Sequence, residues 1–138
     1  MLPSNISPGC PVGSRLAFRA AGLVGCLAVV SIHIIDQGGI PGSKNPQYIQ
    51  GLYYILEAAG VFTAFLLLIN PAWLGWFLSL WVATGPIVGY VLSRGPGLPF
   101  YTDDIGNWME PLGVVSLAVE GVLMVLAAAC LVSLITPK

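Results

Sequence analysis

Charged side chains are scarce in this sequence. Only 8% of its 138 residues are Asp, Glu, Lys or Arg, and five basic residues face six acidic ones. Ordinary soluble domains carry about 25% charged residues, so the chain has too little polar surface to cover a water-soluble fold. The near-zero net charge also removes the basic surface with which proteins bind nucleic acid.

Residue types that common cofactors and catalytic centres need are also missing. His33 is the only histidine, which excludes a haem held by two histidines, and the apolar runs contain no lysine for a retinal-type Schiff base. Cys10, Cys26 and Cys130 form no Cys-x-x-Cys pair. No phosphate-binding loop, nucleophile elbow or zinc motif is present. We therefore predict no catalytic residue and no metal site, and the cofactor stays unknown.

Long apolar runs are abundant instead, because 57% of the residues are hydrophobic. A helix that crosses a bilayer needs about 20 apolar residues, and four runs are long enough. They lack the apolar–polar alternation of barrel strands, so we predict an all-α fold, a four-helix transmembrane bundle, in residues 16–138. The predicted helices lie at about residues 16–35, 48–69, 72–92 and 108–135. Residues 1–15 are predicted to form a mobile tail.

Basic residues near the spans predict the orientation of the bundle, because cytoplasmic loops carry an excess of Lys and Arg. Arg15 and Arg19 flank the first span and Lys138 follows the last, whereas Lys44 and Arg94 lie in the two connections at the other side. We therefore expect both termini in the cytoplasm and a multi-pass protein of the cell (plasma) membrane.

Two glutamates interrupt the apolar runs at similar depth. Glu57 lies about ten residues into its predicted helix and Glu120 about twelve, which places both close to the middle of a hydrocarbon core about 30 Å thick. An acidic side chain at that depth costs several kcal/mol, so we expect both to face the interior of the bundle. Tyr53 shares the helix face of Glu57, and Ser116 shares that of Glu120.

Two interpretations of these glutamates stay open. In the first, Glu57, Glu120, Tyr53, Ser116 and Thr84 form a site for a proton, a cation or the polar headgroup of a buried ligand such as a quinone. In the second, each glutamate is a protonated carboxyl that bonds a neighbouring helix through a hydroxyl group, such as that of Thr84. The separation of the two carboxyl groups distinguishes a shared site from two isolated packing contacts.

A second group of polar residues is predicted at the outer face of the membrane. His33 lies one turn before Asp36, and three further acidic residues follow the third span, so the predicted cluster contains His33, Asp36, Asp103, Asp104 and Glu110. Imidazole and carboxylate groups suit several divalent ions, which makes a metal site one interpretation. The interpretation that we prefer is a surface histidine at the level of the lipid headgroups.

One run of residues carries a family resemblance. The run Asp-Ile-Gly-Asn-Trp-Met-Glu-Pro-Leu-Gly at residues 104–113 follows Gly-Leu-Pro at residues 97–99. On these motifs, residues 94–124 resemble the uncharacterised small four-span membrane proteins of actinobacterial type, and the architecture is also similar to that of DoxX-type proteins. The resemblance implies a membrane location and transfers no catalytic residue. Taken alone, the run predicts a helix start with Asn107 as the N-cap and Glu110 and Pro111 in the first turn.

The short loops and the absence of a catalytic constellation favour a non-enzymatic multi-pass membrane protein. Our preferred interpretation is an accessory subunit of a larger membrane complex, or a homo-oligomer, with the lipid bilayer as its surroundings. The alternative is a small carrier or channel for protons, cations or a lipophilic redox molecule that uses Glu57 and Glu120. A membrane enzyme with Glu110 or His33 at the outer face is the third interpretation.

Overall fold

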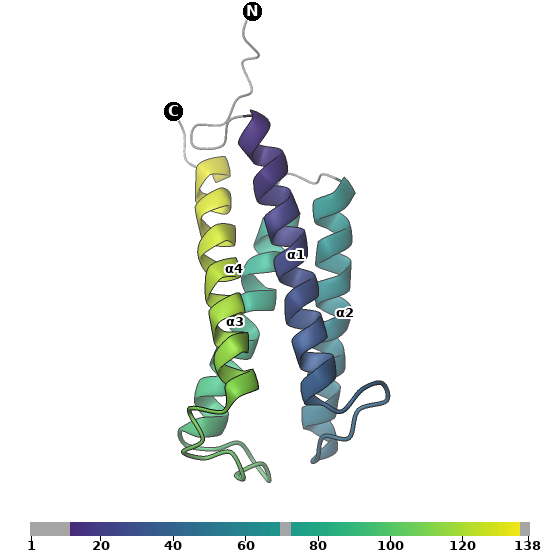
Figure 1. The fold of residues 1–138 in the computed structure, drawn as a ribbon, viewed down its shortest axis with the longest axis vertical. Coiled ribbons are helices and arrows are strands. Elements are labelled where there is room, and N and C mark those ends of the chain that lie inside the picture. The colour runs from purple at the N-terminus through teal and green to yellow at the C-terminus, as the bar shows by residue number, and fades with distance from the viewer. Residues whose placement is uncertain (1–11, 70–72, 136–138) are drawn as a thin grey trace, which may run out of the picture.

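The computed structural model describes residues 12–69 and 73–135, which form four α-helices (Figure 1). The helices are α1 (Val12–Asp36), α2 (Gln47–Ile69), α3 (Leu74–Arg94) and α4 (Pro111–Ile135). Within the described residues the only extended pairing is an isolated bridge between Leu98 and Tyr101. The predicted all-α four-helix bundle is confirmed.

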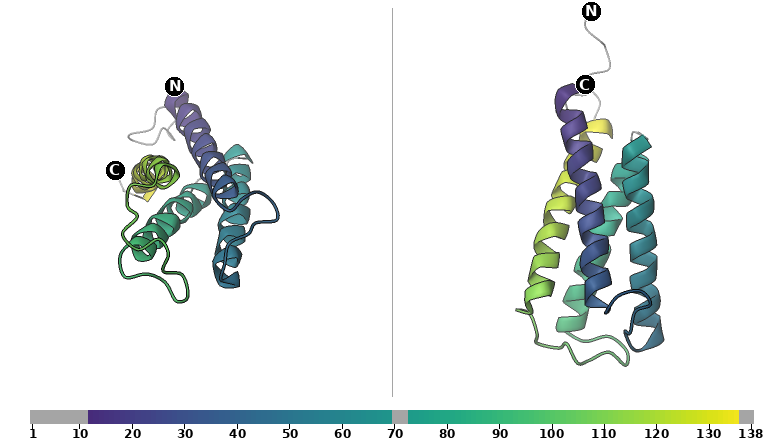
Figure 2. Two further views of the ribbon diagram at one scale, coloured as in Figure 1. Left: turned by 60° about the horizontal axis from the view of Figure 1, so that its bottom comes forward. Right: turned by 45° about the vertical axis from the view of Figure 1, so that its right-hand side comes forward.

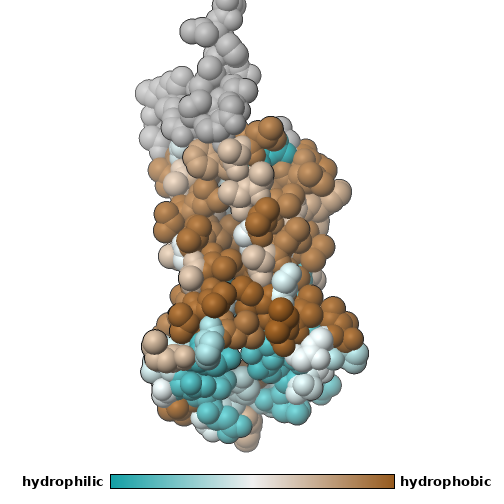
Figure 3. Space-filling model, in the orientation of Figure 1, coloured by the Kyte–Doolittle hydropathy of each residue, from teal (hydrophilic) through white to brown (hydrophobic). Residues whose placement is uncertain are grey.

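All four helices are long and apolar enough to cross a membrane. Large apolar side chains such as Val24, Phe62, Trp81 and Val122 are more than half exposed on the sides of the bundle, where a water-soluble protein would carry polar ones. Figure 3 shows apolar side chains over the body of the visible face and hydrophilic ones gathered at one end. The chain is thus built as a multi-pass membrane protein.

Two helix starts differ from the prediction by more than two residues. α1 begins at Val12, four residues before the apolar run, because hydropathy marks the lipid-facing part of a helix and not its end. α4 begins at Pro111 and not near residue 108. Asn107 is not its N-cap, because the residue before Pro111 is Glu110, whose carbonyl accepts from the Val114 amide (2.9 Å), while Asn107 lies in the preceding turn. The predicted break at Asn70-Pro71 and the tail residues 1–11 lie outside the described residues.

The two ends of the bundle differ. The connections α1–α2 and α3–α4 lie together at one end, here called the loop end, while α1 begins and α4 ends at the opposite, terminal end (Figures 1 and 2). α1 packs mainly on α2, and α3 mainly on α4. α2 and α4 make no direct helix–helix contact and lie on opposite corners of the bundle.

Close helix contacts rest on small residues. A Cβ atom at Gly60 of α2 would lie 2.4 Å from Val30 Cγ2 and 3.6 Å from the Cys26 carbonyl oxygen of α1. Such small residues let backbones approach, which drives helix association in lipid. The apolar core continues from this contact through side chains of all four helices: Cys26, Val29, Ala64, Leu67, Trp76, Val82, Ala83, Leu123, Ala127 and Cys130.

Arg19 of α1 forms hydrogen bonds with the last turn of α2. Its Nε and Nη2 atoms donate to the Leu67 carbonyl oxygen at 2.9 and 2.6 Å, and Nη2 also donates to the Leu68 carbonyl (3.0 Å). The last carbonyls of a helix have no partner within the helix, and a guanidinium group also suits the negative end of its dipole. Arg19 therefore satisfies backbone groups that lipid cannot satisfy.

Candidate ligand-binding cavity

A cavity of about 570 Å³ lies inside the bundle, on the side of α2 and α3. Its walls are mostly apolar and include Leu52, Ile55 and Phe62 of α2 and Trp81 of α3. These four side chains are also more than half exposed on the bundle surface. The cavity is therefore reached from the lipid-facing side, between α2 and α3.

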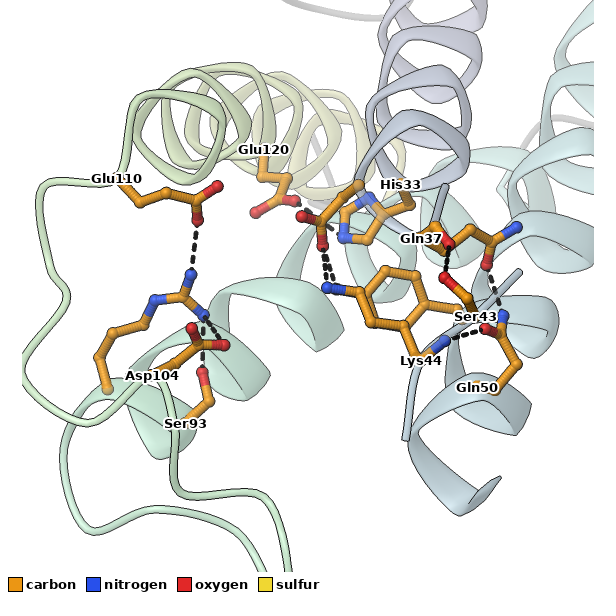
Figure 4. Close-up of polar contacts among 12 residues, drawn as sticks. His33, Gln37, Ser43, Lys44, Gln50, Ser93, Asp104, Glu110 and Glu120 are labelled. Carbon is orange, nitrogen blue, oxygen red and sulfur yellow. Dashed lines mark hydrogen bonds and ion pairs between the residues drawn. The ribbon is translucent and has the colours of Figure 1, made fainter. Parts of the chain in front are cut away.

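The polar inner wall of the cavity is formed by Glu120, Ser116 and His33. Glu120 of α4 is 1% exposed, and its Oε1 atom accepts a hydrogen bond from the Ser116 hydroxyl. His33 of α1 points toward Glu120 (Figure 4), with Nε2 at 3.8 Å from Oε1. The His33 ring also lies edge-on to the Tyr53 ring, with 5.4 Å between ring centroids. An imidazole and a carboxyl group thus meet where the surrounding walls are apolar.

Two charged clusters lie at the loop end of the cavity. In the first, Lys44 Nζ lies 3.1 Å from Asp36 Oδ2, which also accepts a hydrogen bond from the Tyr53 hydroxyl. Lys44 additionally lies 5.3 Å from the centroid of the Tyr53 ring. This cluster joins the end of α1 to the start of α2.

The second cluster is centred on Arg94 at the end of α3. Its Nη2 donates to Glu110 Oε2 (2.8 Å), and its Nη1 lies 3.6 Å from Asp104 Oδ2. The guanidinium group also lies over the Tyr90 ring, 4.2 Å from its centroid. Burial and the neighbouring Asp104 carboxylate raise the pKa of Tyr101 above its usual value, so this phenol stays neutral beside the cluster. The cluster closes the α3–α4 connection against α3.

The structure separates the two glutamates that the sequence places at one depth. Both are buried, at 8% exposure for Glu57 and 1% for Glu120. Glu120 lines the cavity, but Glu57 does not, since α2 faces the cavity with residues such as Leu56 and Ala59. Glu57 Oε1 is buried without a hydrogen-bond partner among the described residues, and the polar side chain that approaches this glutamate is Gln37. The structure therefore gives the two carboxyl groups different surroundings.

Of the remaining predicted site residues, some line the cavity and others do not. Tyr53 and Ser116 line the cavity with Glu120, whereas Thr84 is half-buried and is not among the lining residues. Asp103 is exposed in the α3–α4 connection.

The residues of the predicted outer cluster do not form one group, and four of them lie in three separate contacts. His33 lies against Glu120, Asp36 binds Lys44, and Asp104 and Glu110 both bind Arg94. Over residues 12–69 and 73–135 no group of three or more His, Cys, Asp or Glu side chains is placed to hold a metal ion. Asp36, Asp104 and Glu110 are thus each matched by a cation of the chain itself.

Sequence reasoning missed the partnerships of Lys44 and Arg94. Both residues were used only to orient the chain, and their acidic partners were grouped with one another. The available signal was that each basic residue lies in or next to a connection whose neighbouring helix ends carry Asp or Glu. Comparisons with protein-family models, curated proteins and solved structures gave no match to this chain. The functional interpretation therefore rests on the geometry of the cavity.

Proposed function

We propose that this protein is a carrier or binding protein for a lipophilic small molecule that enters the cavity from the membrane. The observation that carries the proposal is a cavity of about 570 Å³ that combines apolar walls with a few polar groups at its inner wall and loop end. Small-molecule sites are typically of this size and composition. The proposal develops the carrier alternative of the sequence analysis, with Glu120 in the site and Glu57 outside it.

The position of the opening supports a ligand that is supplied by the lipid phase. The rim side chains Phe62 and Trp81 are exposed at the apolar surface of the bundle, whereas His33 and Glu120 lie inside. A ligand with an apolar body and a polar group matches both the apolar rim and the polar inner wall of the cavity. Its body replaces lipid against α2 and α3, and its polar group reaches the hydrogen-bonding side chains.

Gly85 offers a direct test, because it lines the cavity and a Cβ atom there would have nothing within 4 Å. We expect Gly85→Phe to fill the cavity and to weaken binding of a neutral short-chain benzoquinone by about tenfold or more in lipid nanodiscs. Binding is followed by quenching of tryptophan fluorescence, since Trp81 lies in the cavity wall.

Gly121 provides the matched control. It also lies within a helix with nothing within 4 Å of an added Cβ atom, but it is not among the cavity-lining residues. Gly121→Phe should bind the benzoquinone as the original chain does. Equal quenching in both variants, or quenching no greater than in empty nanodiscs across a series of neutral, cationic and anionic lipophilic probes, contradicts the proposal.

The orientation is part of the same proposal. We place the terminal end of the bundle in the cytoplasm, supported by Arg15 and Arg19 near the start of α1, and we assign the protein to the cell membrane. A fluorescent reporter that matures only in the cytoplasm, fused after Lys138, should then fluoresce, while alkaline phosphatase fused there should be inactive. A role as an accessory subunit stays a prediction, since no feature of the described residues identifies a partner.

A further inference from the structure

The charged and titratable side chains that line the cavity include more acids than permanent cations. Among the described residues, the lining side chains of this kind are His33 and Asp36 from α1, Tyr53 from α2, Tyr90 and Arg94 from α3, Tyr101 and Glu110 from the α3–α4 connection, and Glu120 from α4. Three of them are carboxylic acids, and only one is a permanent cation. The cavity therefore presents an excess of acidic groups to its contents.

The positive charges near the cavity are fully engaged at the loop end. All three nitrogen atoms of the Arg94 guanidinium have partners, which are the Asn107 carbonyl, Ser93 Oγ together with Asp104, and Glu110. Lys44 is held by Asp36. Each basic side chain is thus already paired with a carboxylate and offers less attraction to an anionic ligand.

Glu120 differs from the other two acids because no permanent cation balances it. Among the described residues, no lysine or arginine forms an ion pair with Glu120, and its only basic neighbour is His33. The remaining contact at Oε1 is the neutral Ser116 hydroxyl. A bare carboxylate surrounded by apolar walls is costly, so this acid requires a proton or another positive charge beside it.

The second nitrogen of His33 defines how that proton is held. His33 Nδ1 lies 2.8 Å from the Val29 carbonyl oxygen. A carbonyl oxygen can only accept a hydrogen bond, so Nδ1 is the donor and carries the hydrogen. In the neutral ring, Nε2 then carries no hydrogen, and its lone pair faces Glu120 Oε1. The two groups attract each other only when the pair holds a proton, either on His33 Nε2 or on the Glu120 carboxyl group. With that proton the His33–Glu120 pair is neutral overall, and without it the pair carries one negative charge.

We infer that the ligand of the cavity is a lipophilic organic cation, and that it takes the place of the proton on the His33–Glu120 pair. This inference rests on the proposed function and names its ligand class. The positive group of the ligand lies beside the Glu120 carboxylate, and the apolar body occupies the walls between α2 and α3. The rings of Phe62 and Trp81 at the rim contact the apolar body of the ligand. The displaced proton leaves to water at the loop end, and no covalent bond is formed or broken in the ligand.

A pair of probes that share their shape and differ in charge tests this inference. Tetraphenylphosphonium and tetraphenylborate are compared in zwitterionic lipid nanodiscs by equilibrium dialysis, with empty nanodiscs as the blank. At pH about 8 we expect the cation to bind at least about tenfold more tightly than the anion. In weakly buffered medium, at a pH low enough for the free pair to hold its proton, we expect close to one proton to be released for each phosphonium bound. Its affinity should therefore rise by up to about tenfold per pH unit while the His33–Glu120 pair still holds its proton.

Glu120→Gln removes the charge and keeps an oxygen that accepts from Ser116. We expect this variant to lose the preference for the cation, the proton release and the pH dependence. Glu57→Gln is the matched control, because Glu57 is also a buried glutamate of a membrane helix but does not line the cavity. It should behave as the original chain does.

The failure of this inference is distinguishable from failure of the proposed function. Equal binding of the two tetraphenyl probes, or binding of the cation without proton release at a pH where the free pair holds its proton, overturns the inference. If the neutral benzoquinone still binds in a Gly85-dependent way, the proposed function survives that result. If Glu120→Gln does not fold, the proton release of the original chain and its pH dependence still decide the outcome.

Discussion

His33 Nε2 of α1 lies 3.8 Å from Glu120 Oε1 of α4, although 87 positions separate the two residues in the sequence. The contact joins the first helix to the last across the inside of the bundle (Figure 4). It places the only histidine of the chain beside a membrane-buried acid and beneath the opening between α2 and α3. It is the geometric basis of the proposals above and also a packing contact.

His33→Ala should destabilise the bundle, because it removes the one basic neighbour that Glu120 has among the described residues and leaves space beside an almost fully buried acid. We expect a loss of about 1–3 kcal/mol in the free energy of unfolding, measured by denaturation in detergent with helix content as the readout. Ser31→Ala is the control, because the Ser31 hydroxyl donates within α1 to the Leu27 carbonyl and its side chain is exposed. Similar stabilities for the two variants would show that the His33–Glu120 contact contributes little.

Arg94 and Glu110 should act as one unit. Because the Arg94 side chain is only 11% exposed, replacing either residue by alanine leaves the other without its main partner. A double-mutant cycle should give a coupling energy of about 1–2 kcal/mol. Faster proteolysis of the α3–α4 connection in the Arg94→Ala variant is the second readout. Strict additivity of the two substitutions is the contrary outcome.

Gly60→Leu should weaken the α1–α2 contact, since an added Cβ atom would already lie 2.4 Å from Val30 Cγ2. Overpacking of this kind costs about 1–3 kcal/mol, and the thermal unfolding midpoint should fall accordingly. Gly51→Leu on the same helix has nothing within 4 Å of its Cβ position and should leave the midpoint unchanged or raise it. A tolerated leucine at position 60 would mean that α1 and α2 separate at little cost.

Tyr101 should make the protein sensitive to strong alkali. Its pKa in the folded chain lies above the value of about 10 in an unfolded chain. Above about pH 10 the unfolded chain therefore releases a proton that the folded chain retains, so stability falls as the pH rises through this range. Tyr101→Phe should lose less stability than the original chain over the same range. Unfolding followed at a series of alkaline pH values measures the difference, and parallel curves for the two chains would contradict the assignment.

The membrane-spanning helices were predictable because their signal is local. A run of about 20 apolar residues with little charge indicates a spanning helix wherever it occurs in the chain, and α2 matches its predicted range within one residue. The start of α4 was not predictable at the same precision. The chain makes a turn in which the Asn107 amide bonds the Asp104 carbonyl, and α4 begins after it, at Pro111.

The candidate site was predictable only in part. The burial of Glu120 beside Ser116 follows from four-residue spacing on one helix. Which side of α2 faces the cavity does not follow from such spacing, so Glu57 was grouped with Glu120 on depth alone. Depth along a helix is encoded in the sequence position, whereas the direction in which a side chain points depends on how the neighbouring helices are arranged.

The sequence by itself determined that this protein has four spans in lipid with acids buried among them. Each polar residue that contacts hydrocarbon carries its own free-energy cost, so the residue types along each stretch decide whether it spans the membrane. Only the tertiary structure decided the partners. In the folded chain His33 contacts Glu120, Arg94 forms ion pairs with Asp104 and Glu110, and a cavity opens between α2 and α3. These choices depend on the rotation and tilt of each helix against its neighbours. Such quantities arise from the packing of distant segments and have no counterpart in any single stretch of the chain.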